Sequence, residues 1–207
     1  MKQVTTKDNS VTFFNENYEE TYHSISGALQ EAFEKYVKPC KIKDGMKILD
    51  ICFGLGYNSL AAIHSADNLK IIALENDPKI LDMTNEIEIR TDLKKDFEKI
   101  KRLCKDLHYK DDKCEMTLLL GDGRKTIKEI DDKFDTVFLD PFSPKKCPEL
   151  WTLEFFKDIV KLMKKPSILA TYSCARIIRD NLKSCGLEVK DGPYVGRYAP
   201  STLACLK

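Results

Sequence analysis

The residues with the clearest chemical potential are two glycines and a glutamate that follow consecutive apolar runs. Gly54 and Gly56 stand one residue apart, directly after the apolar run 46–53. Glycines at this spacing permit a sharp turn and a close approach of backbone to a ligand, and a following helix offers unpaired N–H groups. Glu75 ends the next run, about 20 residues later, where a carboxylate can accept both hydroxyls of a ribose. The pattern predicts a polar ligand that carries a ribose.

Two departures from the dinucleotide fingerprint narrow that ligand. Ser59 stands where the third glycine would be, and the bulky pair Tyr57-Asn58 follows the second glycine, where a pyrophosphate needs open space. These features favour a ligand with one nucleoside and no diphosphate. The turn Gly121-Asp122-Gly123 follows the third apolar run and could accept the exocyclic amine of adenine through Asp122. Plain turns and helix caps are the structural alternatives for all of these residues.

A fourth apolar run ends in Asp140, the residue we expect at the centre of the chemistry. Parallel strands bring their carboxyl ends to one edge of a sheet, so Asp140 is expected in the same crevice as Gly56 and Asp122. Three prolines in the following segment 141–148 stiffen the loop around a substrate. If the acceptor is an amine, the carboxylate can hold an N–H and aim the nitrogen lone pair at a donor atom. Alternatively, Asp140 caps the next helix or binds its own loop.

Apolar runs and helical stretches alternate along the chain and position these residues. The expected strands of the main sheet are 46–53, 69–74, 115–120, 134–139, 167–172, 187–190 and 202–206. The expected helices are 18–38, ended by Pro39, and 58–64, 78–88, 150–163 and 175–185. A further short strand is expected at 11–14, and solvated helices in a charged insert at about 86–112. This order predicts an α/β fold with an open, mostly parallel seven-stranded sheet and an antiparallel hairpin at its edge.

Composition sets limits on the class of protein. With 207 residues, 43% hydrophobic and 32% charged, the chain fits one globular domain. No apolar run reaches the roughly 18 residues that cross a bilayer, and the start lacks a signal peptide, so we expect a cytoplasmic protein with no membrane partner. Eight scattered cysteines without a C-x-x-C pair indicate free thiols and no metal site. The formal charge of +1 indicates no polyanionic partner by itself.

The glycine loop, the acidic strand end and the G-D-G turn together resemble the nucleoside-binding edge of class I (Rossmann-like) methyltransferases and of aminopropyltransferases. That resemblance implies S-adenosyl-L-methionine, or its decarboxylated relative, as the ligand. Three segments are more specific: 18–28 (YEETYHSISGA), 53–58 (FGLGYN) and 140–152 (DPFSPKKCPELWT). They resemble the methyltransferase domain of the MnmC type. This resemblance implies N-methylation of the 5-aminomethyl group of a wobble uridine in tRNA, giving 5-methylaminomethyl(-2-thio)uridine.

The same resemblance assigns expected roles to individual residues. It places Asp140 beside the reactive methyl group. It implies that the donor is bound by Glu20, His23, Gly54, Gly56, Asn58, Glu75, Asp122 and Gly123. It places on the substrate side Phe142, Lys145, Trp151 and Arg197. Core packing is the alternative for Trp151. Residues 1–45 are expected to be an extension that closes over the active site, and 46–207 to be the methyltransferase domain.

The chain departs from the best-known members in two ways. Those members carry a fused FAD-dependent oxidase, for which 207 residues leave no room. We therefore expect no FAD, and we expect the aminomethyl substrate to come either by another route or from a separate oxidase that acts beforehand. The near-neutral charge leaves binding of the tRNA anticodon region to a local patch. The candidates for that patch are Lys145, Lys146, Lys164, Lys165, Arg176, Arg179 and Arg197. We also expect the target base to be extruded, because a stacked base cannot meet a buried donor.

Three other functions compete. An aminopropyltransferase resembling spermidine synthase shares the fold and an amine acceptor, but Lys145 and Lys146 would repel a polyamine. A small-amine N-methyltransferase would use the same chemistry. A binding module without catalysis would have kept the fold as a scaffold, although the joint presence of Gly56, Glu75 and Asp140 speaks against lost chemistry.

Overall fold

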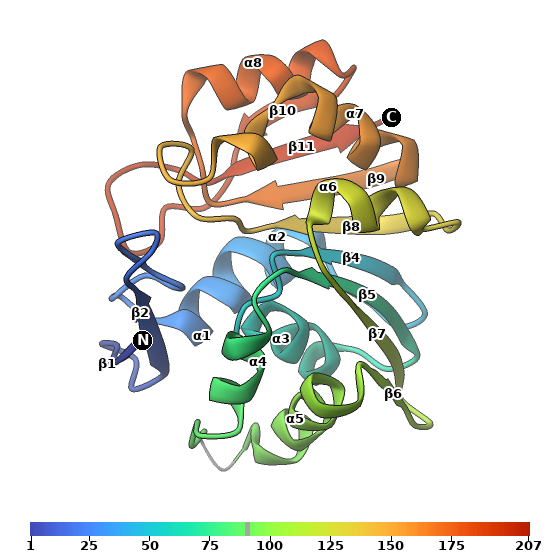
Figure 1. Ribbon diagram of the computed structural model, residues 1–207. Helices are drawn as coiled ribbons and strands as arrows, with labels where there is room; N and C mark the ends of the chain where they lie inside the picture. The colour runs from blue at the N-terminus through green and yellow to red at the C-terminus, as the bar shows by residue number, and fades with distance from the viewer. Residues whose placement is uncertain (90–91) are drawn as a thin grey trace.

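A computed structural model describes residues 1–89 and 92–207 of the chain (Figure 1). Within these residues, an eight-stranded sheet has the order β10-β11-β9-β8-β4-β5-β7-β6. The parallel strands are β4 (Lys47–Ile51), β5 (Leu69–Glu75), β7 (Cys114–Leu120), β8 (Phe134–Leu139) and β9 (Met163–Thr171). The antiparallel strands at the edges are β6 (His108–Lys110), β10 (Glu188–Asp191) and β11 (Thr202–Leu206). The predicted α/β fold with a mostly parallel sheet and an edge hairpin is confirmed.

The predicted number of strands in this sheet was one too low. The additional strand, β6, pairs antiparallel with β7 and lies within the charged insert, where only helices were expected. It has three residues and no apolar alternation, so it left no signal in the sequence. The rest of the insert includes the expected helix, α5 (Lys94–Asp106), while residues 90–91 of the insert lie outside the described part.

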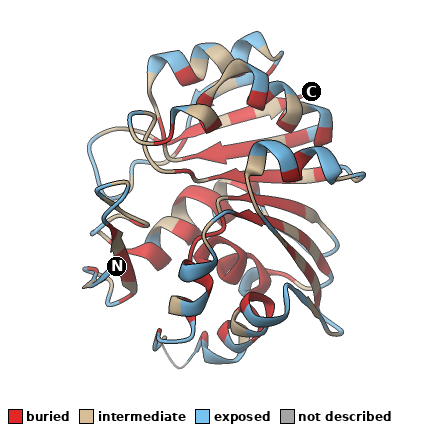
Figure 2. Cartoon of the chain, viewed as in Figure 1, coloured by how far each residue is buried: buried red, intermediate tan, exposed pale blue. Residues whose placement is uncertain are grey.

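Both faces of the sheet are covered by helices, as expected for strands that are apolar on both sides. Along β4, Ile48 packs into one hydrophobic cluster, whereas Leu49 and Ile51 pack into the other. Figure 2 shows the buried strands between the two helical layers. The first layer contains α1 (Ala28–Glu31), the π-helical η1 (Ala32–Val37), α2 (Lys38–Cys40), α3 (Tyr57–Ser65), α4 (Pro78–Thr84) and α5. The second layer contains α6 (Gly123–Thr126), η2 (Ile127–Glu129), η3 (Pro148–Trp151), α7 (Leu153–Leu162) and α8 (Arg176–Ser184).

The N-terminal segment forms a small antiparallel sheet beside the carboxyl ends of the parallel strands (Figure 1). Its strands are β1 (Lys2–Thr5), β2 (Val11–Asn15) and β3 (Glu20–Thr21). The helix predicted from Tyr18 therefore begins only at Ala28. The preceding residues pair with β2, and Ser24 accepts the backbone N–H of Ser26, a local bond that competes with a helix.

The end of that helix was also slightly misplaced. Pro39 lies inside the last turn, and the helix ends at Cys40, with Lys41 left-handed at φ 54°. Pro39 stands at the start of the short α2, directly after the π-helical turn, and the first turn of a helix is where the missing N–H of proline is tolerated. No helix in the described residues is long and apolar enough to cross a bilayer. The eight cysteines, all within the described residues, are free.

Candidate active site

The predicted glycine loop turns sharply at the carboxyl end of β4. Gly54 and Gly56 have φ values of 56° and 76°, in the left-handed region that favours glycine. A Cβ at residue 56 would lie 2.5 Å from Cζ of Phe53 and 2.7 Å from Cγ2 of Ile100. A larger residue at position 56 would be strained and would have to displace these side chains. Gly56 is the N-cap of α3, which begins at Tyr57 directly after the loop.

Glu75 closes this loop from the end of β5. One carboxylate oxygen accepts the N–H of Gly54 at 2.8 Å, and the other accepts those of Asn76 at 2.9 Å and Asp77 at 3.0 Å. Burial raises the pKa of Glu75, and the three backbone donors oppose that rise. A carboxylate offers about four lone-pair directions. At least one of them is therefore left for a ligand in the cavity that Glu75 lines.

An inner cavity of about 170 Å³ lies between the ends of β5 and β7. It is lined by Ile51, Cys52, Leu74, Glu75, Asn76, Gly121, Asp122, Gly123, Arg124, Cys147, Glu149 and Leu150. Asp122 caps α6 by accepting the backbone N–H of Arg124 at 3.0 Å, and it also accepts from the Arg124 guanidinium at 2.6 Å. The hydrogen bonds from Arg124 lower the pKa of Asp122. Its carboxylate is therefore a helix cap that also faces the cavity.

Asp140 lies at the end of β8, held from two helices of the first layer. Tyr36 of η1 donates its hydroxyl to one carboxylate oxygen at 2.5 Å, and Asn58 of α3 donates its amide to the other at 3.0 Å. Burial raises the pKa of Asp140 to about 6, against the lowering effect of both donors. Within the described residues, no backbone N–H of the following loop or of the next helix donates to its carboxylate. The alternative in which Asp140 caps that helix is therefore wrong.

Asn58 thus reaches the site through Asp140. Its side chain is buried, with 4% exposed, and its amide is committed to the carboxylate. The structure brings it together with the catalytic candidate rather than with the inner cavity, which it does not line.

A small cavity of about 40 Å³, which we call the throat, lies between the inner cavity and a larger outer cavity described below. It shares lining residues with both of them. Its wall contains Phe142, whose ring stacks on Tyr18 with centroids 4.4 Å apart and contacts Tyr22 at 4.9 Å. Trp151 is buried and donates its indole N–H to the carbonyl of Phe142 at 2.9 Å. Trp151 therefore lies in the core, behind the throat, and supports Phe142 from there.

An outer cavity of about 560 Å³ opens beyond Asp140. Its lining includes Glu20, His23, Glu31, Lys35, Asp140, Phe142, Ser143, Tyr172 and Arg197. Burial lowers the pKa of His23 to about 4, so this imidazole is neutral. Glu20 accepts the backbone N–H of Ser143 at 2.9 Å and also its hydroxyl, which fastens the N-terminal sheet to the loop after β8.

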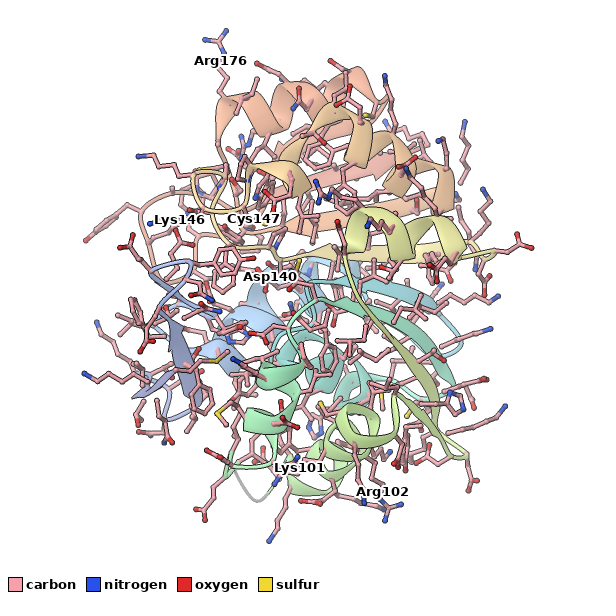
Figure 3. The ribbon with its side chains drawn as sticks, viewed as in Figure 1. Lys101, Arg102, Asp140, Lys146, Cys147 and Arg176 are labelled. Carbon is pink, nitrogen blue, oxygen red and sulfur yellow. The ribbon has the colours of Figure 1, made fainter. Side chains whose placement is uncertain are left out.

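The predicted basic residues do not form one patch. Lys145 is exposed but lines none of these three cavities, and Lys146, labelled in Figure 3, pairs with Glu19. Lys164 pairs with Asp135 at the first residues of β9 and β8. Because these strands are parallel, that pair lies at the opposite edge of the sheet from Asp140.

The remaining basic candidates lie at the edge of the site. Arg179 pairs with Asp191, and Arg176 projects into solvent with 96% of its side chain exposed (Figure 3). Arg197 lines the outer cavity and donates to the carbonyl of Tyr172. Of the candidates for the expected patch, Arg176, Arg179 and Arg197 therefore lie at this edge, whereas Lys164 and Lys165 lie near the start of β9, at the opposite edge.

Sequence reasoning missed several residues that build the site. Tyr36, Glu31 and Lys35 come from the predicted helix 18–38, in which only Glu20 and His23 were expected to be site residues, yet Lys35 is only 3% exposed and pairs with Glu31. Asp50, within β4, is fully buried and accepts the Ser59 hydroxyl at 2.7 Å. Burial raises the pKa of Asp50 to about 7. An aspartate inside an otherwise apolar run was the one signal that could have marked it.

The sheet order, the glycine loop and the carboxylates at three strand ends define the class I α/β architecture that binds a nucleoside-containing cofactor. A family model described as S-adenosyl-L-methionine-dependent methyltransferase matches residues 84–207. The chain belongs to this family. Its residues fit that methyl donor, because a buried carboxylate with at least one free lone pair faces the inner cavity, beside a backbone turn that favours glycine.

The similar proteins narrow the family further. An uncharacterized protein of Methanocaldococcus jannaschii is 38% identical over 97% of this chain and 58% of its own length. The tRNA 5-methylaminomethyl-2-thiouridine biosynthesis bifunctional protein MnmC of Leptospira interrogans is 26% identical over 94% of this chain. The chain spans about a third (34%) of that relative.

Solved structures agree with these relatives. The crystal structure of MNMC2 from Aquifex aeolicus has a TM-score of 0.87 and 32% identity, and the match covers all of this chain and 70% of that one. The resemblance to the MnmC-type methyltransferase domain is confirmed. Spermidine synthase from Thermotoga maritima, with a TM-score of 0.61 and 14% identity over 99% of this chain and 71% of that one, shares the fold alone.

Proposed function

We propose that the chain transfers a methyl group from S-adenosyl-L-methionine to the 5-aminomethyl group of a wobble uridine in tRNA. The observation that carries this proposal is the position of Asp140, a half-buried carboxylate between the inner and outer cavities. The names of the MnmC relatives support the tRNA substrate, and they favour methyl transfer over aminopropyl transfer.

We assign the donor to the inner side of the site. There Glu75 would accept the ribose hydroxyls, and Asp122 with Gly123 would receive the adenine edge. The turn at Gly54 and Gly56 would let the backbone approach the ligand, while Glu20 and His23, at the throat and outer cavity, would close over the methionine end. When bound, the donor supplies an electrophilic methyl group on a sulfonium.

Asp140 would hold and orient the acceptor amine. Tyr36 and Asn58 each use one of its carboxylate oxygens, and the remaining lone pairs can accept N–H groups of the amine. With a pKa of about 6, the carboxylate is ionised at neutral pH and can take part in removing the amine proton. The nitrogen lone pair then points at the methyl carbon, and orientation of this kind is the main contribution a protein can make to such a displacement.

We place the uridine in the outer cavity. Phe142 and Arg197 line it, Lys145 stands exposed on the adjoining loop, and Trp151 supports Phe142 from behind. The base would enter extruded from its stack. Residues 1–45 would act as the extension that closes over the site, and a separate enzyme would supply the aminomethyl group. We place the reaction in the cytoplasm.

Transfer of labelled methyl to tRNA that lacks only the final wobble methyl group tests the proposal. Label in the wobble nucleoside with the unchanged protein, and its loss in Asp140→Ala, is the expected result. Calorimetric titration with the donor serves as the control, because Asp140→Ala should still bind it. Donor binding without label in tRNA would overturn the tRNA assignment and leave the methyltransferase class intact.

A further inference from the structure

Large apolar side chains that are exposed to solvent gather around the mouth of the outer cavity. Ile25 lines that cavity and is 57% exposed. Tyr194 and Tyr198 flank the three residues Val195–Arg197 of the β10–β11 loop, which line it as well, and they are 63% and 105% exposed. Solvent-exposed tyrosines are ordinary singly, but a pair at the rim of a functional cavity indicates a contact surface.

The loop that carries the two tyrosines is fixed at several points. At its base, the N–H of Gly192 donates to the carbonyl of Ser201 and the N–H of Ser201 to that of Pro193, both at 2.9 Å. Arg197 donates to the carbonyls of Tyr172 and Pro200. Gly196 lies so close to the N-terminal segment that a Cβ would meet the hydroxyl oxygen of Ser26 at 2.1 Å. An anchored loop holds both rings outward, so stacking on them would cost little conformational entropy.

Neither tyrosine ring has a bonding or stacking partner among the described residues. In the described part of the chain, the rings of Tyr194 and Tyr198 make no side-chain hydrogen bond or ring contact. Cations lie at the same edge, because Arg197 is exposed in the loop and Arg176 begins α8 just after the end of β9 (Figure 3). Planar aromatic rings beside cationic side chains are the combination that binds unstacked bases and their phosphates.

We propose that Tyr194 and Tyr198 form a stacking platform for the single-stranded nucleotides that flank the target base. This inference rests on the proposed function. A base drawn into the outer cavity leaves its neighbours in the anticodon loop without a stacking partner, and the two rings stand at the mouth to replace it. Arg197 and Arg176 would contact the adjoining phosphates.

The test compares two substrates that differ only in the flanking nucleotides. One is an anticodon stem-loop RNA with 5-aminomethyluridine at the wobble position, and the other is the free nucleoside. The variant Tyr194→Ala/Tyr198→Ala should raise KM for the stem-loop by about 10-fold or more. It should leave kcat and KM for the nucleoside unchanged. Tyr194→Phe/Tyr198→Phe should behave like the unchanged protein, because it keeps both rings.

Leu107→Ala, which removes an exposed apolar side chain on the turn after α5, controls for nonspecific effects. An unchanged KM for the stem-loop in the double alanine variant would overturn the platform. An equal rise for both substrates would do the same. If the unchanged protein methylates neither substrate, the proposed function fails, and stem-loop binding by fluorescence anisotropy still decides whether the tyrosines hold RNA.

Discussion

The inner and outer cavities are built in different ways. Around the inner cavity, the carboxylates are held mainly by backbone groups. Glu75 accepts three backbone N–H groups, and Asp122 caps α6 by accepting the backbone N–H of Arg124. Around the outer cavity, side chains from distant segments meet. Tyr36 and Asp140 are 104 residues apart, and Glu20 and Ser143 are 123 apart.

Because of this difference, the outer cavity depends on docking of the N-terminal segment, whereas the inner cavity does not. The strand ends that form the inner cavity are fixed as soon as the parallel sheet pairs. The outer cavity exists only when the N-terminal sheet and the following helix pack against the loop after β8. Changes at the inner cavity should therefore act on donor binding, and changes at the outer cavity on the acceptor and on stability.

The largest effect is expected from Glu75→Ala. This change removes the proposed ribose acceptor. It also leaves the N–H groups of Gly54, Asn76 and Asp77 without their acceptor, which is costly in free energy because unpaired donors inside a protein have lost their hydrogen bonds to water. Donor affinity measured by calorimetry should fall by about 100-fold or more. Glu75→Gln should lose nearly as much, because its amide NH₂ group would face backbone donors. Donor binding within a factor of two of the unchanged protein would refute the ribose role.

Lys35→Met should act on stability while leaving the donor in place. Lys35 is 3% exposed and its partner Glu31 is 13% exposed, so the change leaves a largely buried carboxylate without its cation. Loss of one partner of such a pair costs about 3 kcal/mol in the free energy of unfolding. Denaturant titration measures this loss, and the double variant Glu31→Gln/Lys35→Met should recover part of it. Reduced donor affinity with unchanged stability would contradict the division between the two cavities.

The inner cavity was largely predictable from the sequence. Glu75 and Asp122, which line it, stand at the ends of apolar runs, and parallel pairing alone brings the ends of such runs to one edge. Asp140 lies at the same edge but lines the throat and the outer cavity, and Gly56 lines none of the three cavities. Of the N-terminal sheet, only the strand expected at 11–14 was foreseen, and it is confirmed as β2. The short strands β1, β3 and β6 could not be foreseen, because none of them has a periodic apolar pattern.

The outer cavity was predicted less well for a physical reason. Tyr36 and Lys35 lie on a helix whose pattern allows both solvent exposure and burial, and only tertiary packing decides between them. Two further features likewise depend on neighbours that the local sequence does not reveal. They are the pairing of Arg124 with Asp122 and the position of Trp151 in the core.

A smaller effect is expected from Tyr36→Phe, and it should depend on pH. The Tyr36 hydroxyl lowers the pKa of Asp140, which burial raises to about 6, so its removal raises that pKa further. The carboxylate is needed in its ionised form, so activity is lost as pH falls through the pKa. The acid limb of the rate profile should therefore move up by about one pH unit, with little change above pH 8.

Tyr57→Phe is the matched control for this prediction. Tyr57 is also buried, but its hydroxyl donates to the carbonyl of Val11 at 2.7 Å rather than to Asp140. It should leave the acid limb in place. A pH profile unchanged by Tyr36→Phe, or moved equally by both variants, would show that the hydroxyl does not tune the carboxylate.

The smallest effect is expected from Glu20→Ala at the contact between the N-terminal sheet and the loop after β8. The change removes both bonds from Ser143, and partly exposed hydrogen bonds of this kind contribute about 1 kcal/mol each. Steady-state kinetics should show KM for tRNA raised by roughly 3- to 10-fold with a smaller change in donor affinity. Lys146→Ala breaks the neighbouring exposed pair with Glu19, which should be almost neutral. If the lysine variant had the larger effect, charge near the RNA rather than closure by the N-terminal segment would govern the outer cavity.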